Sequence, residues 1–572
     1  MKYDNMQSGH FIDRPNRFVA HVETDGREET VHVKNTGRCA ELLKPGAVVY
    51  MQDSQNKKRK LRWDLITVEK EGLMVNMDSQ APNKVVREWL EAGNLLRDIT
   101  LIKPEYTYGN SRIDLYVEAA GRKILIEVKG VTLEENGVAR FPDAPSERAV
   151  KHVKELEEAV REGYDAYVLF VVQMRGMRYF TPNTDTHPEF GEALLKAEER
   201  GVHVLAYECD VTEDSICLTK EIPVVLSEPS LYEARGAVVD WFRENQRDLP
   251  WRRTKDPYRI WVSEIMLQQT RVEAVKPYYD RFLQELPTVR ALAGAEEDRL
   301  LKLWEGLGYY NRVKNMQKAA RQIVADYGGE FPRTYAEIRT LKGIGNYTAG
   351  AVGSFAYGLA EPAVDGNVLR VITRITGDDS DIMKQGTRKG IEDKLRKIIP
   401  ADAAGDFNQG LIELGALVCV PGGEPRCEVC PVKDICEARR QGRIQELPVK
   451  TKAKDRRIEK RTILVFRDCD KIAIEKRPGK GLLAGLYGLP GRSGRLSVKE
   501  VAEYSKHIGL MPVRIRRLPD AKHIFSHVEW HMTGYEILVD ELEKTNKKDF
   551  LFARPEEIQK IYPIPSAFEK YM

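Results

Sequence analysis

The sequence lacks the features that mark membrane proteins and exported proteins. It has no run of about 18 apolar residues, so no segment is expected to span a bilayer. Its first residues, MKYDNMQSGHFIDRPNRF, contain neither an apolar core nor a small-residue cleavage site, so we expect no secretory signal. An internal repeat and a long low-complexity tract are absent as well. We therefore expect ordinary folded domains and no membrane partner.

The net charge is also small. The 90 Lys and Arg residues nearly balance the 87 Asp and Glu residues, which leaves +3. Any binding of nucleic acid must therefore use local basic patches. Two candidate patches are NKKRKLR, Asn56 to Arg62, and KTKAKDRRIEKR, Lys450 to Arg461. Runs of this kind are more often solvated loops.

Cysteine is sparse and unevenly placed. Without an export signal the eight cysteines point to a reducing compartment, where clustered thiols more often bind metal than form disulfides. Four are scattered, and we interpret them as small core residues: Cys39, Cys209, Cys217 and Cys469. The other four fall within 18 residues: Cys419, Cys427, Cys430 and Cys436.

The length and the patterning indicate several domains. A chain of 572 residues is too long for one core, and at about 100 to 200 residues per domain it implies about three to five domains. Short strands with a few helices are expected over 18–225. Amphipathic helices punctuated by Gly and Pro follow over 232–440. A charged stretch then predicts a linker, after which strands return.

One hairpin in the first region combines acidic and basic side chains. RIDLYVEAAGRKILIEVKG predicts two strands joined by a tight turn at Ala120 and Gly121, so that paired positions sum to 241. Asp114 then faces Glu127, and Lys129 shares that side of the ribbon because side chains alternate. A divalent ion such as Mg²⁺ held by the two carboxylates, with the lysine beside a reacting phosphate, would suit the arrangement. A solvated outer face is the alternative.

A glycine-rich turn lies between helical segments of the middle region. LKGIGNYTAGAV places Gly343 and Gly345 around an apolar residue, so that backbone N–H groups can point outward at the start of the next helix. Such a turn suits a phosphate oxygen and is typical of a helix-hairpin-helix, which anchors the DNA backbone without reading sequence. A plain connection between helices would also use these glycines.

The clustered cysteines follow a helical stretch and read C-x7-C-x2-C-x5-C. Four thiolates at this spacing can hold either a tetrahedral zinc ion or an iron-sulfur cluster. The spacing alone leaves both alternatives open.

A lone glutamate interrupts an apolar helix in WVSEIMLQQT. In the expected helix YRIWVSEIMLQQTRVEAV, Glu264, Gln268 and Arg271 lie along one face, one turn apart. A half-desolvated Glu264 should have a raised pKa and keep its proton near neutral pH. The alternative is a glutamate that caps its own helix or pairs with Arg271. The core stripe of this helix is expected to consist of Val262, Ile265, Met266 and Val272.

A second carboxylate stands before another helix, in EPAVDGNVLRVITRI. Asp365 follows an apolar pair and could be a simple N-cap. It could equally place negative charge near a reacting centre.

The first region resembles the sugar fermentation stimulation protein family, SfsA, over most of residues 1–228. The resemblance is carried by PNRFVAHVE, NTGRCAELLKPG, SRIDLYVE, EVKGVTL, RFPDAPSERAVKH, LFVVQM and LAYE. It implies an OB-like barrel followed by an α/β nuclease-like domain of the PD-(D/E)xK type with DNA-binding capacity. Asp114, Glu127 and Lys129 match the motif of that core. DNA cleavage and DNA binding alone both stay open.

The middle region, from WFRENQRDLPWR to CEARR, resembles the endonuclease III and MutY superfamily. In that superfamily four cysteines bind a four-iron four-sulfur cluster, which the resemblance assigns to Cys419, Cys427, Cys430 and Cys436. The first spacer here, VPGGEPR, has seven residues where the family usually has six. Arg426 is the basic residue that this loop offers to DNA.

Two positions indicate the MutY branch, the adenine DNA glycosylases. Tyr347 stands where the endonuclease III branch has its lysine nucleophile, so base excision without strand cleavage is expected. Glu264 matches the glutamate that protonates N7 of an extruded adenine. Asp365 matches the catalytic aspartate that stabilises an oxocarbenium-like sugar, with Asn367 beside it. Base and backbone contacts are expected from Leu267, Gln268, Gln269, Gly343 and Gly345.

The last region resembles the C-terminal domain of MutY. GLLAGLYGLPG looks like the start of a Nudix-like domain, but the acidic metal box does not follow, so nucleotide hydrolysis is not expected. In KHIFSHVEWHMTGYEI the resemblance implies that Phe525, Ser526 and His527 read 8-oxoguanine opposite the target adenine. Period-two alternation along one strand would put His523, His527 and His531 on one face, which leaves a zinc site as the alternative.

The sequence thus predicts a multidomain fusion. The expected partner is double-stranded DNA with adenine opposite 8-oxoguanine or guanine, bound by a monomer in the bacterial cytoplasm at the nucleoid. A bifunctional glycosylase/lyase and a non-catalytic DNA-binding regulator are the alternatives. The expected domains are an OB-like barrel (1–80), a PD-(D/E)xK nuclease-like α/β domain (81–228), an all-α helix-hairpin-helix glycosylase domain with its cluster loop (229–442), a linker (443–460) and an α+β Nudix-like domain (461–572).

Overall fold

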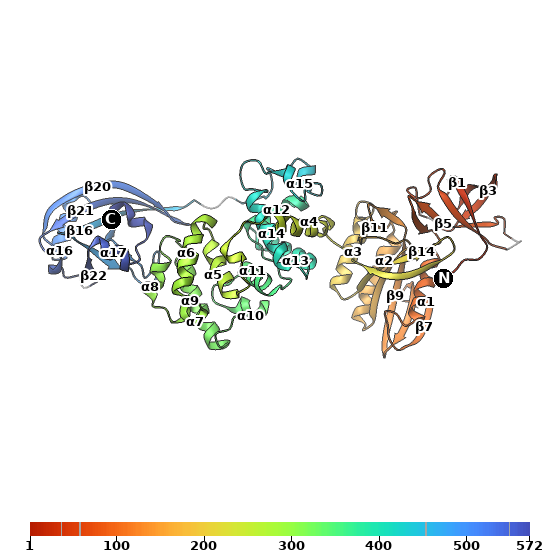
Figure 1. Ribbon diagram of the computed structural model, residues 1–572, viewed down its shortest axis with the longest axis horizontal. Helices are drawn as coiled ribbons and strands as arrows, with labels where there is room; N and C mark the ends of the chain where they lie inside the picture. Colours follow the sequence, from red (N-terminus) through yellow and green to blue (C-terminus); the bar gives the residue numbers. More distant parts are fainter. Residues whose placement is uncertain (36, 56–58, 452–454, 548) are drawn as a thin grey trace. The chain divides into compact units, whose positions relative to one another are not determined.

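The computed structural model describes residues 1–35, 37–55, 59–451, 455–547 and 549–572, and they form two compact units. The first unit is Met1–Tyr232 and the second is Glu233–Met572 (Figure 1). Within these described residues, no helix has both the length and the apolar character needed to cross a bilayer. Both expected basic patches lie partly outside the described residues, at 56–58 and 452–454.

The first unit begins with a closed barrel. Strands β1 to β5 form it because β3 pairs in parallel with β5 and joins the two ends of the sheet β3-β2-β1-β4-β5. Alternating side chains such as Val22, Val49 and Leu65 are buried inside. The expected OB-like barrel is confirmed. The strands are β1 (Met6–Asn16), β2 (Val19–Thr24), β3 (Arg27–Val33), β4 (Val48–Asp53), β5 (Trp63–Lys70) and β6 (Leu73–Asn76).

A mixed sheet follows, with strand order β15-β14-β12-β9-β8-β7. Its central strands β9, β12 and β14 are parallel to one another and apolar on both faces, because α1 covers one face and α2 and α3 cover the other. A smaller sheet, β10-β11-β13, lies beside it. The elements are α1 (Ala81–Glu91), β7 (Ile99–Tyr108), β8 (Ser111–Ala119), β9 (Arg122–Val131), β10 (Leu133–Glu135), β11 (Val138–Phe141), α2 (Glu147–Arg161), β12 (Asp165–Val172), β13 (Tyr179–Pro182), α3 (Pro188–Glu199), β14 (His203–Val211) and β15 (Ile216–Ile222).

The second unit opens with an all-helical domain, and the apolar core formed by its residues 249–363 includes Trp261 and Trp304. Its α-helices are α4 (Pro229–Asn245), α5 (Pro257–Leu267), α6 (Val272–Glu285), α7 (Val289–Gly294), α8 (Glu297–Leu303), α9 (Asn311–Asp326), α10 (Tyr335–Thr340), α11 (Asn346–Tyr357), α12 (Gly366–Thr376), α13 (Gln385–Ile398), α14 (Ala404–Leu417) and α15 (Glu437–Arg440). Short 3-10 turns are η1 (Pro250–Arg252) and η2 (Cys427–Val429).

One expected helix is two. The helix expected to run from Tyr258 through Val275 ends at Leu267, and α6 starts at Val272. Gln269 between them has φ of 59°, in the left-handed region, which no continuous right-handed helix contains. Arg271 therefore does not share a helical face with Glu264, and Val272 is half-buried where a core position was expected.

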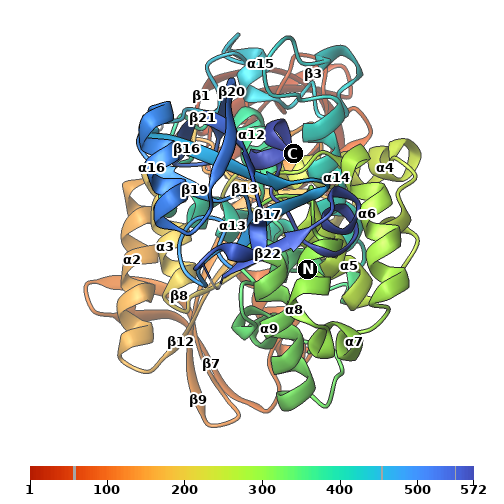
Figure 2. The same ribbon diagram turned by 90° about the vertical axis from the view of Figure 1, so that its left-hand side faces the viewer.

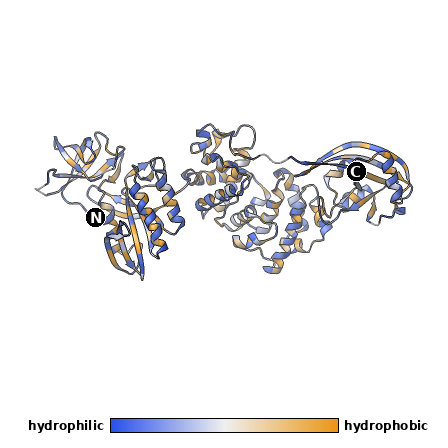
Figure 3. Cartoon of the chain, turned by 180° about the vertical axis from the view of Figure 1, so that it is seen from behind, coloured by the Kyte–Doolittle hydropathy of each residue, from blue (hydrophilic) through white to orange (hydrophobic). Residues whose placement is uncertain are grey.

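The chain ends in a sheet with strand order β18-β17-β16-β21-β20, covered by α16 on one face and by α17 and η4 on the other (Figures 1 and 2). Figure 3 shows hydrophobic residues along its strands. The elements are β16 (Arg457–Asp468), β17 (Lys471–Lys476), β18 (Tyr487–Gly488), β19 (Gly491–Ser493), α16 (Val498–His507), β20 (Pro512–Ile524), β21 (Val528–Val539), η3 (Leu542–Lys544), β22 (Phe550–Ala553), α17 (Pro555–Ile561) and η4 (Ser566–Tyr571).

The histidine trio does not lie on one strand. His523 is in β20, His531 is in β21, and His527 is in the turn that joins them. His523 pairs with Trp530 in this antiparallel hairpin, while His531 pairs with Lys522. The expectation of one strand face, and with it the zinc alternative, was wrong because the chain reverses at Phe525–His527.

Two smaller expectations are met only in part. Cys39 and Cys209 are buried as expected, but Cys217 and Cys469 are exposed. The expected linker over 443–460 overlaps β16, which begins at Arg457 and pairs in parallel with β21. Pairing with a central strand overrides the polar composition of this segment.

Candidate functional site

Three helices bring Glu264, Tyr347 and Asp365 to one cavity of about 650 Å³ in the second unit. Glu264 lies near the end of α5, and Tyr347 lies in the first turn of α11 after the glycine-rich turn. Asp365 is the N-cap of α12. These residues are 83 and 101 positions from Glu264 in sequence, so only the tertiary fold brings them together.

Glu264 is enclosed, with 6% of its surface exposed. Its Oε2 accepts a 2.6 Å hydrogen bond from the phenol of Tyr347. Burial raises the pKa of Glu264 to about 7, and the negative charge of Asp365 adds to the rise, whereas the hydrogen bond from Tyr347 and the charge of Arg252 oppose it. The shift has the direction that the sequence analysis expects, but the partner is Tyr347 and not Arg271.

Asp365 caps its helix and also faces the cavity. Its Oδ1 accepts hydrogen bonds of 2.8 Å from the backbone N–H groups of Asn367 and Val368. Its Oδ2 accepts from the side-chain amide of Asn367, whose own carbonyl accepts from Arg370. Burial raises the pKa of Asp365, and the two backbone donors partly offset that rise. The N-cap and cavity-facing interpretations are therefore both true of one carboxylate.

A buried ion cluster forms another part of the cavity wall. Glu413 of α14 is fully buried and accepts hydrogen bonds from the guanidinium groups of Arg247 and Arg252. Burial alone would raise the pKa of Glu413, but these hydrogen bonds and charges lower it to about 2. Arg252 is thereby fixed near Glu264. The sequence analysis missed this cluster because no local motif joins its members.

Of the two hairpin glycines, only Gly343 needs to be glycine. Gly343 has φ of 81°, and a Cβ there would lie 2.7 Å from Cβ of Asn315. Gly345, the N-cap of α11, is extended, and a Cβ on it would meet no atom within 4 Å. The backbone N–H groups at the start of α11 remain suited to a phosphate oxygen.

The end of α5 borders two cavities. Gln268 lines the cavity with Glu264 and also a second cavity of about 670 Å³. Of these two cavities, Leu267 and the exposed Gln269 line only the one that contains Glu264. The structure thus brings Gln268 close to both groups of expected contact residues.

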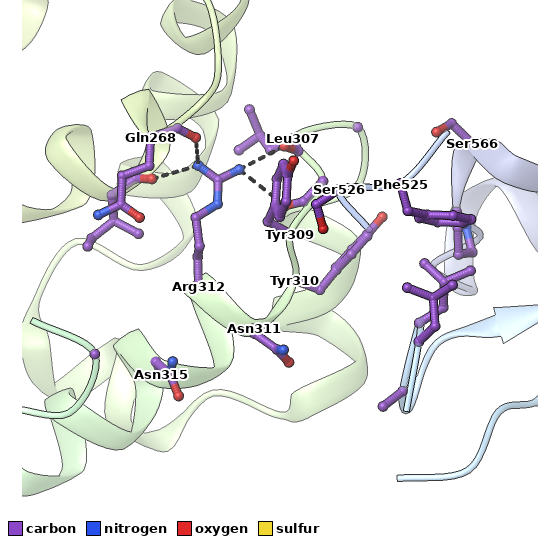
Figure 4. A pocket seen from close by; sticks show the side chains of 18 of the residues that line it. Gln268, Leu307, Tyr309, Tyr310, Asn311, Arg312, Asn315, Phe525, Ser526 and Ser566 are labelled. Atoms are coloured by element: carbon purple, nitrogen blue, oxygen red, sulfur yellow. Dashed lines mark hydrogen bonds between the residues drawn. The ribbon is translucent and has the colours of Figure 1, made fainter. Parts of the chain in front are cut away.

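The second cavity lies between the helical domain and the β20–β21 hairpin (Figure 4). Phe525, Ser526 and His527 line it from the hairpin turn. Phe525 packs edge-on against Trp530 with ring centroids 5.0 Å apart, and its N–H donates to the carbonyl of Val528. The turn is therefore held by its own strands.

Tyr309 and Arg312 line the opposite wall of this second cavity, and the sequence analysis missed both. Tyr309 has φ of 45°, and 49% of its surface is exposed. A bulky side chain in the left-handed region is a backbone outlier that often marks a functional loop. The glycines on either side of Leu307, in GLGYYNR, are the sequence signal that could have pointed to this loop.

The four clustered cysteines line one small cavity with Arg374 and apolar side chains of α12 and α14. Nη1 of Arg374 lies 3.2 Å from Sγ of Cys419, and Sγ of Cys436 donates to the carbonyl of Arg374. Within the described residues, no group of three or more His, Cys, Asp or Glu side chains is already arranged to hold a metal ion. Four thiols around a shared space, with a cation beside them, fit the cysteine-only ligand set of an iron-sulfur cluster.

In the first unit, the expected hairpin register is confirmed. Ala119 pairs with Arg122, and Ala120 and Gly121 both have positive φ, as a type I′ turn requires. The ladder continues to the pair Leu115 and Ile126, one residue short of the two carboxylates. Beyond that pair, Oδ2 of Asp114 accepts a hydrogen bond from the backbone N–H of Val128.

The acidic pair faces inward and not into water. Burial raises the pKa of Asp114, and the charge of Glu127 raises it further. Glu127 is buried, and its Oε1 accepts from Lys129 at 2.5 Å and from His152 of α2. Its Oε2 is buried without a hydrogen-bond partner in the described structure. The solvated-face alternative was wrong, and an orphaned carboxylate oxygen beside a second carboxylate fits a hard divalent ion.

His152 belongs to the RFPDAPSERAVKH segment and was not among the expected site residues. It borders a groove of about 490 Å³ that Arg112, Arg148 and Lys151 also line. The ring of His152 therefore lies between this basic groove and Glu127.

Comparison with known proteins agrees with these features. The SfsA N-terminal OB domain matches residues 12–77, and the sugar fermentation stimulation protein RE domain matches 80–215. The HhH-GPD superfamily base excision DNA repair protein matches 262–400, and the NUDIX domain matches 462–572.

Individual relatives match parts of the chain. A sugar fermentation stimulation protein homolog of Clostridium beijerinckii is 58% identical over 226 residues, which are 40% of this chain and all of that protein. The structure of Pyrococcus furiosus SfsA in complex with Ca²⁺ is 30% identical, with a TM-score of 0.37, over 39% of this chain and 98% of the other. The structure of a thermostable thymine-DNA glycosylase is 29% identical, with a TM-score of 0.34, over 37% of this chain and 98% of the other.

The domains thus follow one another as the sequence predicts, and each carries the side chains described above. The chain belongs to the sugar fermentation stimulation protein family through its first unit, to which a base excision repair glycosylase domain of the HhH-GPD superfamily and a NUDIX domain are fused.

Proposed function

We propose that the second unit is a monofunctional adenine DNA glycosylase that removes adenine mispaired with 8-oxoguanine or guanine in double-stranded DNA. One observation carries the proposal: the enclosed carboxyl group of Glu264 has a pKa of about 7 and accepts a hydrogen bond from a phenol. Such an acid keeps a proton near neutral pH and can deliver it to a base. The cavity around it has the volume of a small-molecule site.

The mechanism follows from the positions of the side chains. The target nucleotide leaves the stack and its base enters the cavity. Glu264 donates its proton to N7 of adenine, which makes the base a better leaving group. As the glycosidic bond breaks, the carboxylate of Asp365 stabilises the positive charge that develops on the sugar. Asn367 holds that carboxylate in place, and a water molecule completes the hydrolysis.

Tyr347 favours hydrolysis over lyase chemistry. A lyase needs an amine that forms a Schiff base with the sugar, and the phenol at this position cannot do so. The hydroxyl of Tyr347 is instead engaged with Glu264. Borohydride should therefore trap no covalent adduct between the protein and DNA, and a trapped adduct would favour the bifunctional alternative.

The second cavity supports the proposed mispair. We assign recognition of the base opposite adenine to the turn Phe525–His527, which faces Tyr309 across this cavity. Ser526 and His527 supply hydrogen-bonding groups there, while Phe525 supplies an aromatic face. We assign contact with the DNA backbone to the turn around Gly343.

We also propose that the four clustered cysteines hold a four-iron four-sulfur cluster with a structural role. Bound there, the cluster would cross-link the loop 419–436 to itself, beside the apolar side chains of α12 and α14 that line the same cavity. Arg374 would stabilise the negative charge of its ligands. Arg426 would remain available to DNA.

Replacement of Glu264 by glutamine tests the function. The amide preserves the shape but has no acidic proton to transfer, so the single-turnover rate of adenine release should fall by about 10² to 10⁴. Glu273→Gln is the matched control, because Glu273 is an exposed residue paired with Lys276. An undiminished rate in the Glu264 variant would falsify the assignment. Failure of the unmodified protein to release adenine from either mispair would favour the non-catalytic alternative.

For the first unit we propose a metal-dependent nuclease site made of Asp114, Glu127 and Lys129. The observation that favours it is the buried, unpartnered Oε2 of Glu127 beside Asp114. A divalent ion such as Mg²⁺, when bound by the two carboxylates, would activate water and stabilise the phosphate. Lys129 lies within reach of the same centre, and the cations of the adjoining groove suit a DNA backbone.

Cleavage of DNA by the full chain with and without Mg²⁺ tests this second function. Asp114→Asn should abolish the cleavage, whereas Asp165→Asn, which removes an exposed partner of Arg122, should leave it unchanged. Because the pKa of Asp114 is raised, protons compete with the ion and activity should increase with pH. Absence of cleavage with Mg²⁺, Mn²⁺ and Ca²⁺ would leave DNA binding as the role of this unit.

A further inference from the structure

Arg312 connects the end of α5, which borders both cavities of the second unit, to the Leu307–Tyr309 loop, which borders the second cavity. It lies in the first turn of α9, and its Nη1 donates to the carbonyl groups of Ile265 at 2.8 Å and Gln268 at 2.5 Å. Its Nη2 donates to the carbonyl groups of Leu307 at 2.7 Å and Gly308 at 3.2 Å. Figure 4 shows the guanidinium between Gln268 on one side and the Leu307–Tyr309 loop on the other.

The free carbonyl groups at the end of α5 do not by themselves require an arginine as their hydrogen-bond donor. The last carbonyl groups of a helix are commonly satisfied by a glycine cap or by water. Here burial lowers the pKa of Arg312 to about 10, and the partners described above are uncharged carbonyl groups. A planar guanidinium can hold two separate sets of acceptors in a fixed geometry, which a lysine cannot do. The arrangement thus suits a rigid connection between two segments.

Each connected segment borders a different site. On one side, α5 carries Glu264 immediately before Ile265, and Gln268 lines both cavities. On the other side, the Leu307–Tyr309 loop carries Tyr309 in a left-handed conformation toward the cavity of Phe525–His527. A displacement of Tyr309 by the opposing base would therefore act on the carbonyl groups that Arg312 also holds in α5.

We propose that Arg312 is a positioning residue that couples the identity of the base in the second cavity to the alignment of Glu264 in the first. The inference rests on the proposed function and adds a means of discrimination between 8-oxoguanine and guanine opposite adenine. It assigns to Arg312 no contact with the reacting atoms.

A double-mutant cycle with Arg312→Lys and Ser526→Ala tests this coupling. Single-turnover rates are measured for adenine opposite 8-oxoguanine and opposite guanine, and their ratio gives the discrimination. In the unmodified background, Ser526→Ala should lower this ratio by about tenfold, within the usual range of coupling between sites. With Lys at position 312 the ratio should already be low, and Ser526→Ala should lower it no further.

Controls separate coupling from loss of folding. Arg281→Lys alters an exposed arginine of α6 and should leave the ratio unchanged. If Arg312→Lys does not fold, Gly308→Ala is the substitute. Gly308 has φ of 69°, which strains the backbone when a side chain is present, and a Cβ there would meet no atom within 4 Å, so the loop is perturbed without a clash. Gly308→Ala should reduce the ratio in the same way.

The outcomes distinguish the two proposals. Multiplicative effects of the two substitutions, or an unchanged ratio in a folded Arg312 variant, would overturn the coupling while the glycosylase assignment stands. If the unmodified protein releases adenine from neither duplex, the proposed function fails and the coupling fails with it.

Discussion

The phenol of Tyr347 donates a 2.6 Å hydrogen bond to Oε2 of Glu264. Donation to a carboxylate favours its charged form, so this bond holds the pKa of Glu264 below the value that burial alone would give. The phenol of Tyr347 therefore tunes the acid of the proposed reaction.

The first prediction concerns pH. Glu264 acts in its protonated form, so the single-turnover rate should fall as pH rises through about 7. Tyr347→Phe removes the hydrogen bond that lowers the pKa, so the fall should move to higher pH, by about one unit for a bond to a charged group. A pH profile of adenine release measures the shift. Tyr335→Phe, outside the cavity, should leave the profile unchanged, and a downward shift in Tyr347→Phe would contradict the prediction.

Substitutions of Asp365 can distinguish the effect of its negative charge from its role as the N-cap of α12. Asparagine caps a helix about as well as aspartate, so Asp365→Asn should change the free energy of unfolding little. The same variant removes the charge that stabilises the sugar, and we expect the single-turnover rate to fall by at least about 10². Asp365→Ala should lose the cap as well, at a cost of about 1 kcal/mol. Equal rates in Asp365→Asn and the unmodified protein would refute the role.

The cysteine loop gives a spectroscopic prediction. Cys430→Ser removes one of the four thiols around the shared cavity, so protein purified without oxygen should contain less iron and absorb less visible light. Cys469→Ser alters an exposed cysteine outside the loop and should change neither measurement. Full iron content with four bound irons in Cys430→Ser would argue against this ligand set.

The buried cluster around Glu413 gives a stability prediction. Glu413→Gln leaves Arg247 and Arg252 near an uncharged group, so unfolding should become easier by about 3 to 5 kcal/mol. Because the pKa of Glu413 is lowered to about 2, its contribution is complete above the unfolded pKa of about 4.3 and is lost as pH falls through about 2. Urea unfolding at pH 7 and pH 3 measures both effects.

A matched surface pair is the control for this prediction. Asp406→Asn removes the partner of Arg243 in an exposed pair, so the free energy of unfolding should change far less than in Glu413→Gln. A similar change in Glu413→Gln would show that the buried cluster contributes no more than a surface ion pair.

Local patterns predicted what depends on neighbours in sequence. The hairpin around Ala120 and Gly121 has the expected register because a two-residue turn fixes the pairing of the strands that it joins. The direction of the pKa shift of Glu264 could be expected because the apolar residues around it in sequence indicate a buried helix. These features require no knowledge of distant contacts.

The failed expectations share a different cause. Periodicity continued through Gln268 to Thr270, yet the helix ends at Leu267, where Arg312 of α9 takes over its carbonyl groups. Alternation continued through the Phe525–His527 turn, yet the chain reverses there. A pattern of apolar residues that continues along the sequence does not reveal that the chain turns within it.

By itself the sequence determined the order of the domains, the barrel and the helical domain, the inward carboxylate of Glu264 and the grouping of four cysteines. Only the tertiary structure decided that Tyr347 and Asp365 share a cavity with Glu264, that Oε2 of Glu127 is buried without a partner, and that Arg312 connects two walls. The physical reason is range: turns, caps and periodicity act over a few residues, whereas enclosure and electrostatic partners depend on segments that only packing brings together.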